Sequence, residues 1–228
     1  MQAHLFESKD ALNHAFAERL VAILSQGIAE NGRASLLVSG GRTPLPLFKQ
    51  LSETNIDWSK VDISLVDERW VDETDEASNT RLVKENLLQG YAASANFVEI
   101  KTSHAQAEEA VATCTEQLAS MQTPFDALIL GMGEDGHTAS LFPCSEQVQA
   151  GLDLNTQADY IAVQPTTAPH QRMSLTLKRI LASKHIFLHL TGDSKKAVLD
   201  EALAGDDALQ MPIRAVLNNA DVQLMWAP

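Results

Sequence analysis

Short apolar runs alternate with segments of helical periodicity along this chain, and that order constrains its fold most strongly. The runs expected as strands are residues 34–38, 61–66, 97–100, 125–130, 160–163, 185–190 and 222–226. The segments expected as helices, with apolar side chains every three or four positions, are 10–30, 82–88, 108–121 and 195–204. Residues 173–182 fit either a strand or a helix. Runs this apolar are typical of strands that are covered on both faces.

Strands and helices in alternation predict an α/β protein with three layers: a mostly parallel, twisted sheet with helices on both faces, as in Rossmann-like folds. No internal repeat or low-complexity linker divides the chain, so we expect a single domain over residues 1–228. Ligands of such sheets bind at the carboxyl ends of the strands. We therefore expect a site among the loops that follow Val38, Val66, Leu130, Val163 and Leu190.

The charge balance limits the partners. The chain has 17 Lys and Arg against 30 Asp and Glu, a formal net charge of −13. A nucleic-acid or acidic-membrane binder needs a dense cationic surface, so we expect neither partner. No apolar run approaches the ~20 residues of a membrane span, and we see no secretory signal. Cys114 and Cys144 lack metal-type spacing and are interpreted as packing residues in a reducing compartment, so we expect a cytoplasmic protein.

The loop Ser39-Gly-Gly-Arg-Thr-Pro44 joins a buried strand to a predicted helix. Gly40 and Gly41 let the backbone turn sharply and approach a ligand closely. The free amides and the dipole at a helix start favour a phosphate, and Ser39 and Thr43 add hydroxyl groups. The loop therefore indicates a phosphate site, although it lacks the ending of a P-loop. A tight turn with Thr43 as a helix cap is the alternative.

Charged residues follow the next buried strand directly, in Asp67-Glu-Arg-Trp70. Charges beside a sheet are costly unless they are paired or used. Arg69 offers a planar fork that suits a phosphate, a carboxylate or a lactone oxygen, and a local ion-pair cluster is the alternative. Asn79 lies a few residues on. It either helps Ser78 to start the next helix or faces the pocket.

The most informative loop spans residues 131–143. Its Gly131, Gly133 and Gly136 match the dinucleotide-binding pattern G-x-G-x-x-G. Nicotinamide binding is disfavoured because the pattern lies in mid-chain and Pro143 cuts the following helix short. In addition, no strand ends in an acidic residue about 20 positions later. The glycines instead favour a pocket shaped around two polar side chains.

These side chains are Asp135 and His137, two residues apart. Imidazole has a free pKa of about 6.5, so it takes up a proton near neutrality, and a neighbouring carboxylate can fix its tautomer. The strand-end position and the flanking glycines favour a catalytic pair over a surface histidine. The chain has no G-x-S-x-G elbow and no metal signature, so water is the expected nucleophile and we expect no metal. The other six histidines are interpreted as non-catalytic.

Two further cations follow later strands. Arg172 stands just before the ambiguous segment 173–182, and Lys195 lies in the first turn of a predicted helix. A cation at a helix start opposes the helix dipole, which is more easily explained if an anion binds between them. Solvated surface charges are the alternative for both residues.

Together these loops resemble the 6-phosphogluconolactonase family, within the wider group of sugar-phosphate lactonases and glucosamine-6-phosphate deaminases. The most specific stretch is Gly131-Met-Gly-Glu-Asp-Gly-His-Thr-Ala-Ser-Leu-Phe-Pro143. The other matching stretches are 39–44, 67–71 with Ser78-Asn79, Arg172 and Lys195, in one order over most of the chain. Deaminases typically have Gly-His-Ile-Ala-Phe-Asn-Glu-Pro in place of residues 136–143 and Asp-Glu-Tyr in place of 67–69. The resemblance is therefore to the lactonases.

The resemblance implies a fold of the sugar-phosphate isomerase type. It also implies hydrolysis of 6-phospho-D-glucono-1,5-lactone to 6-phospho-D-gluconate, in the oxidative branch of the pentose phosphate pathway, without metal or organic cofactor. The expected catalytic residues are His137, Asp135 and Arg69. The residues expected to hold the substrate are Ser39, Gly40, Gly41, Thr43, Asn79, Arg172 and Lys195.

The expected partner is a small sugar phosphate, and the expected state is a monomer or a weak homo-oligomer. The alternative function is that of a glucosamine-6-phosphate deaminase/isomerase-type enzyme. A sugar-phosphate sensor without catalysis is a third hypothesis, which the presence of both Asp135 and His137 disfavours.

Overall fold

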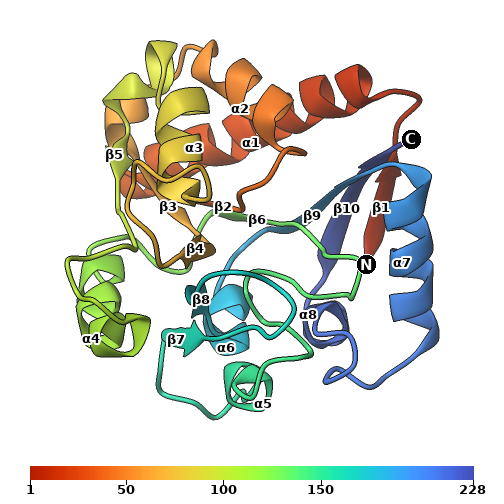
Figure 1. Cartoon of the computed structure of the whole chain (residues 1–228). Coiled ribbons are helices and arrows are strands. Elements are labelled where there is room, and N and C mark those ends of the chain that lie inside the picture. The colour runs from red at the N-terminus through yellow and green to blue at the C-terminus, as the bar shows by residue number, and fades with distance from the viewer.

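The central sheet has seven strands in the order β1-β10-β9-β6-β2-β3-β5, and every neighbouring pair runs parallel (Figure 1). The computed structural model describes residues 1–228. The strands are β1 (Gln2–Leu5), β2 (Ala34–Val38), β3 (Val61–Leu65), β5 (Asn96–Phe97), β6 (Ala127–Leu130), β9 (Ile186–Thr191) and β10 (Val222–Ala227). Every residue of β2, β3 and β6 is buried, as the apolar sequences of β2 and β6 predict.

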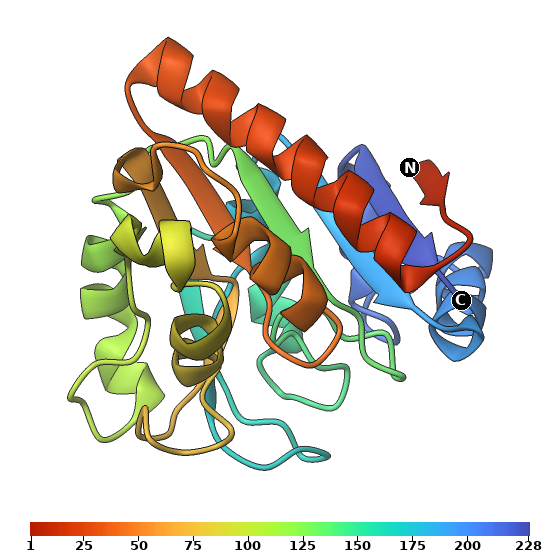
Figure 2. The same cartoon turned by 90° about the horizontal axis from the view of Figure 1, so that it is seen from above.

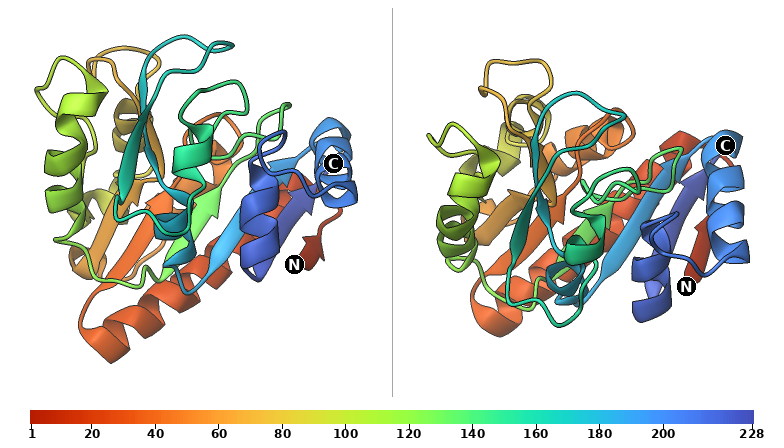
Figure 3. Two further views of the ribbon diagram at one scale, coloured as in Figure 1. Left: turned by 90° about the horizontal axis from the view of Figure 1, so that it is seen from below. Right: turned by 60° about the horizontal axis from the view of Figure 1, so that its bottom comes forward.

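Helices cover both faces of this sheet, which confirms the predicted three-layer α/β architecture. The long α1 (Lys9–Asn31) and α2 (Leu45–Ser52) lie across one face (Figure 2). The short α6 (Leu177–Leu181) and α8 (Ile213–Asn219) lie against the other (Figure 3). The remaining helical segments are α3 (Asn79–Asn86), α4 (Ala107–Leu118), α5 (Val148–Gly151), α7 (Asp193–Ala204) and the 3-10 turns η1 (Trp58–Lys60) and η2 (Gly90–Ser94).

The sequence of helix α1 determines where the helix begins and ends and which face packs on the sheet. The Ser8 side chain accepts a hydrogen bond from the backbone N–H of Ala11, and Gly32 ends the helix in the left-handed conformation with φ of 78°. The fully buried side chains at three- and four-residue steps pack against the sheet; these are Leu12, Phe16, Leu20 and Leu24. Burying each of them contributes roughly 1.5–3 kcal/mol, so this face holds the helix on the sheet.

A second, antiparallel sheet has three strands in the order β4-β8-β7. Its strands are β4 (Asp67–Arg69), β8 (Arg172–Leu175) and β7 (Tyr160–Val163). We expected 160–163 in the parallel sheet and 67–69 as a loop, and both expectations were wrong. The ambiguous segment 173–182 divides into the end of β8 and helix α6.

Val66 explains how the second sheet arises. Its N–H donates to the carbonyl of Val38 in the parallel sheet, and its own carbonyl accepts from the N–H of Leu175 in the small sheet. The chain therefore changes sheets at this residue without leaving a backbone group unpaired. As a result, the segments around β4 and β8 stand above the carboxyl ends of β2 and β6.

Several short elements were not predicted, namely β1, α5 and α8. Helix α3 begins at Asn79 rather than at 82, and β5 covers two residues of a longer expected strand. Cys114 is buried, as expected, whereas Cys144 is partly exposed and is therefore not a core packing residue. None of the helices is long and apolar enough to cross a membrane.

Candidate active site

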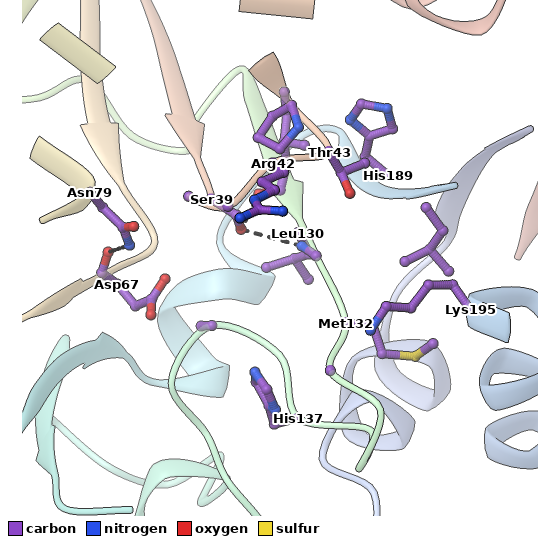
Figure 4. A pocket seen from close by; sticks show the side chains of 18 of the residues that line it. Ser39, Arg42, Thr43, Asp67, Asn79, Leu130, Met132, His137, His189 and Lys195 are labelled. Atoms are coloured by element: carbon purple, nitrogen blue, oxygen red, sulfur yellow. Dashed lines mark hydrogen bonds between the residues drawn. The ribbon is translucent and has the colours of Figure 1, made fainter. Parts of the chain in front are cut away.

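A cavity opens where the strands of the parallel sheet end (Figure 4). It is lined by the loops after β2 and β6, by the ends of β6 and β9, by β4 and β8, and by the first turns of α3 and α7. Predicted site residues that line it are Ser39, Gly40, Gly41, Thr43, Arg69, Asn79, His137, Arg172 and Lys195. Arg42, Asp67 and His189 line it too. The loop after Val163 contributes no lining residue.

The loop after β2 is fixed by two side chains. The Ser39 hydroxyl donates to the carbonyl of Ile129 at 2.9 Å and accepts from the N–H of Gly131 at 3.3 Å. The Ser39 hydroxyl thus joins this loop to the end of β6 and to the loop that follows it. Asn79 lies so close to Gly40 that a Cβ built there would stand 1.9 Å from its Oδ1, so only glycine fits.

Thr43 and Asn79 resolve two alternatives. No side chain caps the start of α2, so Thr43 is not the helix cap and its hydroxyl is left for the cavity. Ser78 caps α3 by accepting from the N–H of Arg81, while Asn79 is the first helical residue and also lines the cavity. The Asn79 amide donates to the carbonyl of Asp67 at 3.0 Å, which directs its Oδ1 toward the loop after β2.

Asp135 and His137 form a hydrogen-bonded pair beside the cavity. Asp135 Oδ1 accepts from His137 Nδ1 at 2.5 Å and from the His137 backbone N–H at 3.1 Å. Burial opposes ionisation of Asp135, but the hydrogen bonds and charge of His137 outweigh it and lower its pKa. An ionised carboxylate only accepts, so Nδ1 carries a proton, and in the neutral ring Nε2 keeps a free lone pair. Asp135 itself does not line the cavity.

Two neighbours hold the His137 ring in place. Phe142 stacks on it with a centroid distance of 4.0 Å and an interplanar angle of 26°. On another side lies Gly133, where a Cβ would stand 2.1 Å from Nδ1 of His137. The glycine pattern thus makes room for the pair. It does not lead into a dinucleotide-binding helix, because no helix begins between β6 and α5.

Arg69 and Arg172 face each other across the β4–β8 pair. The guanidinium of Arg69 donates to the carbonyl of Ala77, and that of Arg172 donates to the carbonyl of Pro169. The Nε of each is buried without a partner. Burial and the charge of Arg69 lower the pKa of Arg172. Two like charges at facing positions destabilise a sheet, and the charges of Asp67 and Glu68 offset this only in part, so the pair favours an anionic ligand.

Glu68 is a functional residue that sequence reasoning missed. It is fully buried, and its carboxylate accepts from the backbone N–H groups of Arg69, Asn79 and Thr80 at 2.6–2.8 Å and from the Ser78 hydroxyl at 3.2 Å. Burial raises the pKa of Glu68, and the backbone hydrogen bonds oppose that shift. Glu68 thereby ties the start of α3 to β4 and positions Arg69 and Asn79.

Six acidic residues lie in the stretch 67–76, and two of them are buried. Asp67 is 6% and Glu68 0% exposed, whereas the remaining four acids are exposed. Asp67 accepts from the Ser140 hydroxyl at 2.5 Å. The charged groups of the cavity wall are thus one carboxylate, Asp67, against four cations, Arg42, Arg69, Arg172 and Lys195. A cationic pocket on an acidic body fits a small anionic ligand.

Lys195 stands in the first turn of α7, as predicted, and its Nζ lies 2.8 Å from Oε1 of Glu134. His189, on β9, is 3% exposed and neither ring nitrogen has a hydrogen-bond partner. Burial lowers the pKa of His189 to about 4. No group of three or more His, Cys, Asp or Glu side chains is arranged to hold a metal ion.

Fold and cavity together define an α/β protein with a cationic cavity at the carboxyl ends of its strands. Residues 7–226 match the family model of glucosamine-6-phosphate isomerases/6-phosphogluconolactonase. The chain belongs to this family.

Individual proteins of this family are similar to the chain in sequence and in structure. A 6-phosphogluconolactonase of Rhizobium meliloti is 42% identical over 227 residues, which cover 99% of this chain and 98% of the relative. The crystal structure of a 6-phosphogluconolactonase from Shewanella baltica superposes with a TM-score of 0.97 at 44% identity, covering 100% and 98% of the two chains. A monomeric glucosamine-6-phosphate deaminase has a TM-score of 0.81 at 17% identity, covering 100% and 97%, and shares the fold.

Proposed function

We propose that the chain hydrolyses 6-phospho-D-glucono-1,5-lactone to 6-phospho-D-gluconate, with water activated by His137. The observation that carries this proposal is the Asp135–His137 pair at the wall of a cavity with four cations. The relatives named 6-phosphogluconolactonase support the substrate.

His137 supplies the base. Its Nε2 takes a proton from water as the water oxygen attacks the lactone carbonyl, and it returns that proton to the ring oxygen as the C–O bond breaks. Such proton transfer contributes typically about 10²–10⁴-fold. Asp135 holds the tautomer that leaves Nε2 free and stabilises the imidazolium that forms. The lactone is an activated ester, so neither a metal nor an organic cofactor is required by this route.

The cations of the cavity stabilise the developing negative charge and bind the phosphate group. Arg69 faces the lactone oxygens, on which negative charge develops, and preorganised donors for such charge are worth roughly 3–4 kcal/mol. Gly40, Gly41 and Thr43 with Arg172 and Lys195 bind the phosphate group. Ser39 and Asn79 hold the shape of that loop through their contacts with Ile129, Gly131 and Gly40.

The test is lactone disappearance against a no-enzyme blank, because lactones also hydrolyse unaided. His137→Ala should fold normally and lose about 10²–10⁴-fold in kcat. A kcat within about threefold of the wild type would contradict the proposed base. Release of ammonia from glucosamine 6-phosphate, without lactone hydrolysis, would establish the deaminase function instead.

A further inference from the structure

Lys195 is already engaged by a side chain of the protein. Its Nζ lies 2.8 Å from Glu134 Oε1. Glu134 comes from the loop that carries the Asp135–His137 pair, whereas Lys195 comes from α7. This ion pair therefore joins the loop of the base to the helix that offers a cation to the cavity.

The Glu134–Lys195 ion pair is exposed enough for a ligand to replace the Glu134 carboxylate. The side chain of Glu134 is 66% exposed and that of Lys195 is 26% exposed. Water screens such exposed pairs, so they stabilise a fold only weakly. A phosphate group near neutral pH has about 1.5 to 2 negative charges and three acceptor oxygens, against the single charge of a carboxylate. It therefore competes well for the same ammonium group.

We propose that Glu134 is an intramolecular competitor for Lys195, which the ligand's phosphate group must displace. The inference rests on the proposed function, in which Lys195 binds that phosphate. Glu134 then weakens the binding of substrate and of product. Its ion pair with Lys195 forms again when the product leaves. It is a specificity-determining residue, because a ligand without a doubly charged group gains too little from Lys195 to displace it.

Glu134→Gln removes the competing charge but keeps the shape of the side chain. It should tighten binding of 6-phosphogluconate and of inorganic phosphate by about two- to fivefold, the range of exposed ion pairs. Gluconate lacks the phosphate group, so its affinity should not change. The matched control is Glu146→Gln, because Glu146 is exposed, follows the same loop and has no ion pair.

The experiment is calorimetric titration of wild type, both Gln variants and Lys195→Ala with 6-phosphogluconate, with inorganic phosphate as a competing ligand. Tighter binding by Glu134→Gln alone supports the proposal. Equal affinities, or equal tightening by Glu146→Gln, overturn it. If Lys195→Ala still weakens binding in that case, the proposed phosphate site stands. If Lys195→Ala has no effect, both the competitor and the phosphate role of Lys195 are wrong.

Discussion

Two histidines line the same cavity, but their surroundings differ. His137 lies in the loop after β6, partly exposed, with Asp135 on its Nδ1 and Phe142 stacked on its ring. His189 lies in β9, packed edge-on against Phe16 and with both nitrogens unpartnered. An imidazole that is buried without a carboxylate stays neutral because its charged form is not solvated. The partner and the exposure, not the residue type, make His137 suited to move a proton.

The comparison extends to the segments that carry the two residues. The loop after β6 holds the group proposed to do the chemistry. The β9–α7 segment holds a buried histidine and the Lys195 proposed to bind phosphate. We therefore expect changes in the first segment to lower kcat, and changes in the second to alter binding or stability.

The largest effect is expected from Asp135→Asn. Without a carboxylate, the tautomer with a free Nε2 is no longer favoured, so kcat should fall by about 10²–10⁴-fold. KM should change little, because Asp135 does not line the cavity. Steady-state kinetics at neutral pH provide the measurement. A kcat within about threefold of wild type would show that Asp135 does not orient the base.

Glu68→Gln tests a buried polar side chain. Both oxygens of its carboxylate accept hydrogen bonds, whereas neither nitrogen of His189 has a hydrogen-bond partner. Gln keeps one acceptor oxygen, but its amide nitrogen cannot accept the hydrogen bonds that the second carboxylate oxygen accepts from Ser78 and Thr80, so the free energy of unfolding should fall by about 1–3 kcal/mol. Urea unfolding measures this loss. The matched control is Glu76→Gln in the exposed part of the same stretch, which should stay within about 0.5 kcal/mol. Equal stabilities of the two variants would refute the role of Glu68.

His189→Leu should change how stability depends on pH. The unfolded chain binds a proton on His189 below about pH 6.5, while the folded chain does so only below about 4. Protons therefore favour the unfolded state as pH falls through this window. From pH 7 to 5, wild type should lose about 2 kcal/mol more of its unfolding free energy than the variant. Parallel losses in urea unfolding would mean that the imidazole is not held neutral.

The smallest effect is expected from Lys195→Ala, which should raise KM about tenfold with kcat changed by less than about threefold. The reason is that phosphate binding lies away from the reacting carbonyl and stabilises ground state and transition state alike. Lys196→Ala is the matched control, since Lys196 pairs with Asp200 along α7. If both alanine variants have the wild-type KM, Lys195 is not a phosphate ligand.

The sequence predicted those strands and side-chain pairs that depend only on residues close together along the chain. The buried runs of β2 and β6 and the Asp135–His137 pair all arise within a few residues. Contacts between distant segments could not be predicted. Arg69 and Arg172 face each other only because Val66 bonds to both sheets, and no local pattern marks that switch. Glu68 was missed because an acid in a charged run usually faces solvent.

In the proposed function, His137 moves a proton and does not hold the ligand. The most direct measurement is the Kd of 6-phosphogluconate for His137→Ala, by calorimetry, beside its kcat for the lactone. We expect a Kd within about threefold of wild type while kcat falls by about 10²–10⁴-fold. A Kd weakened in proportion to the lost rate would contradict it, because His137 would then be a binding residue.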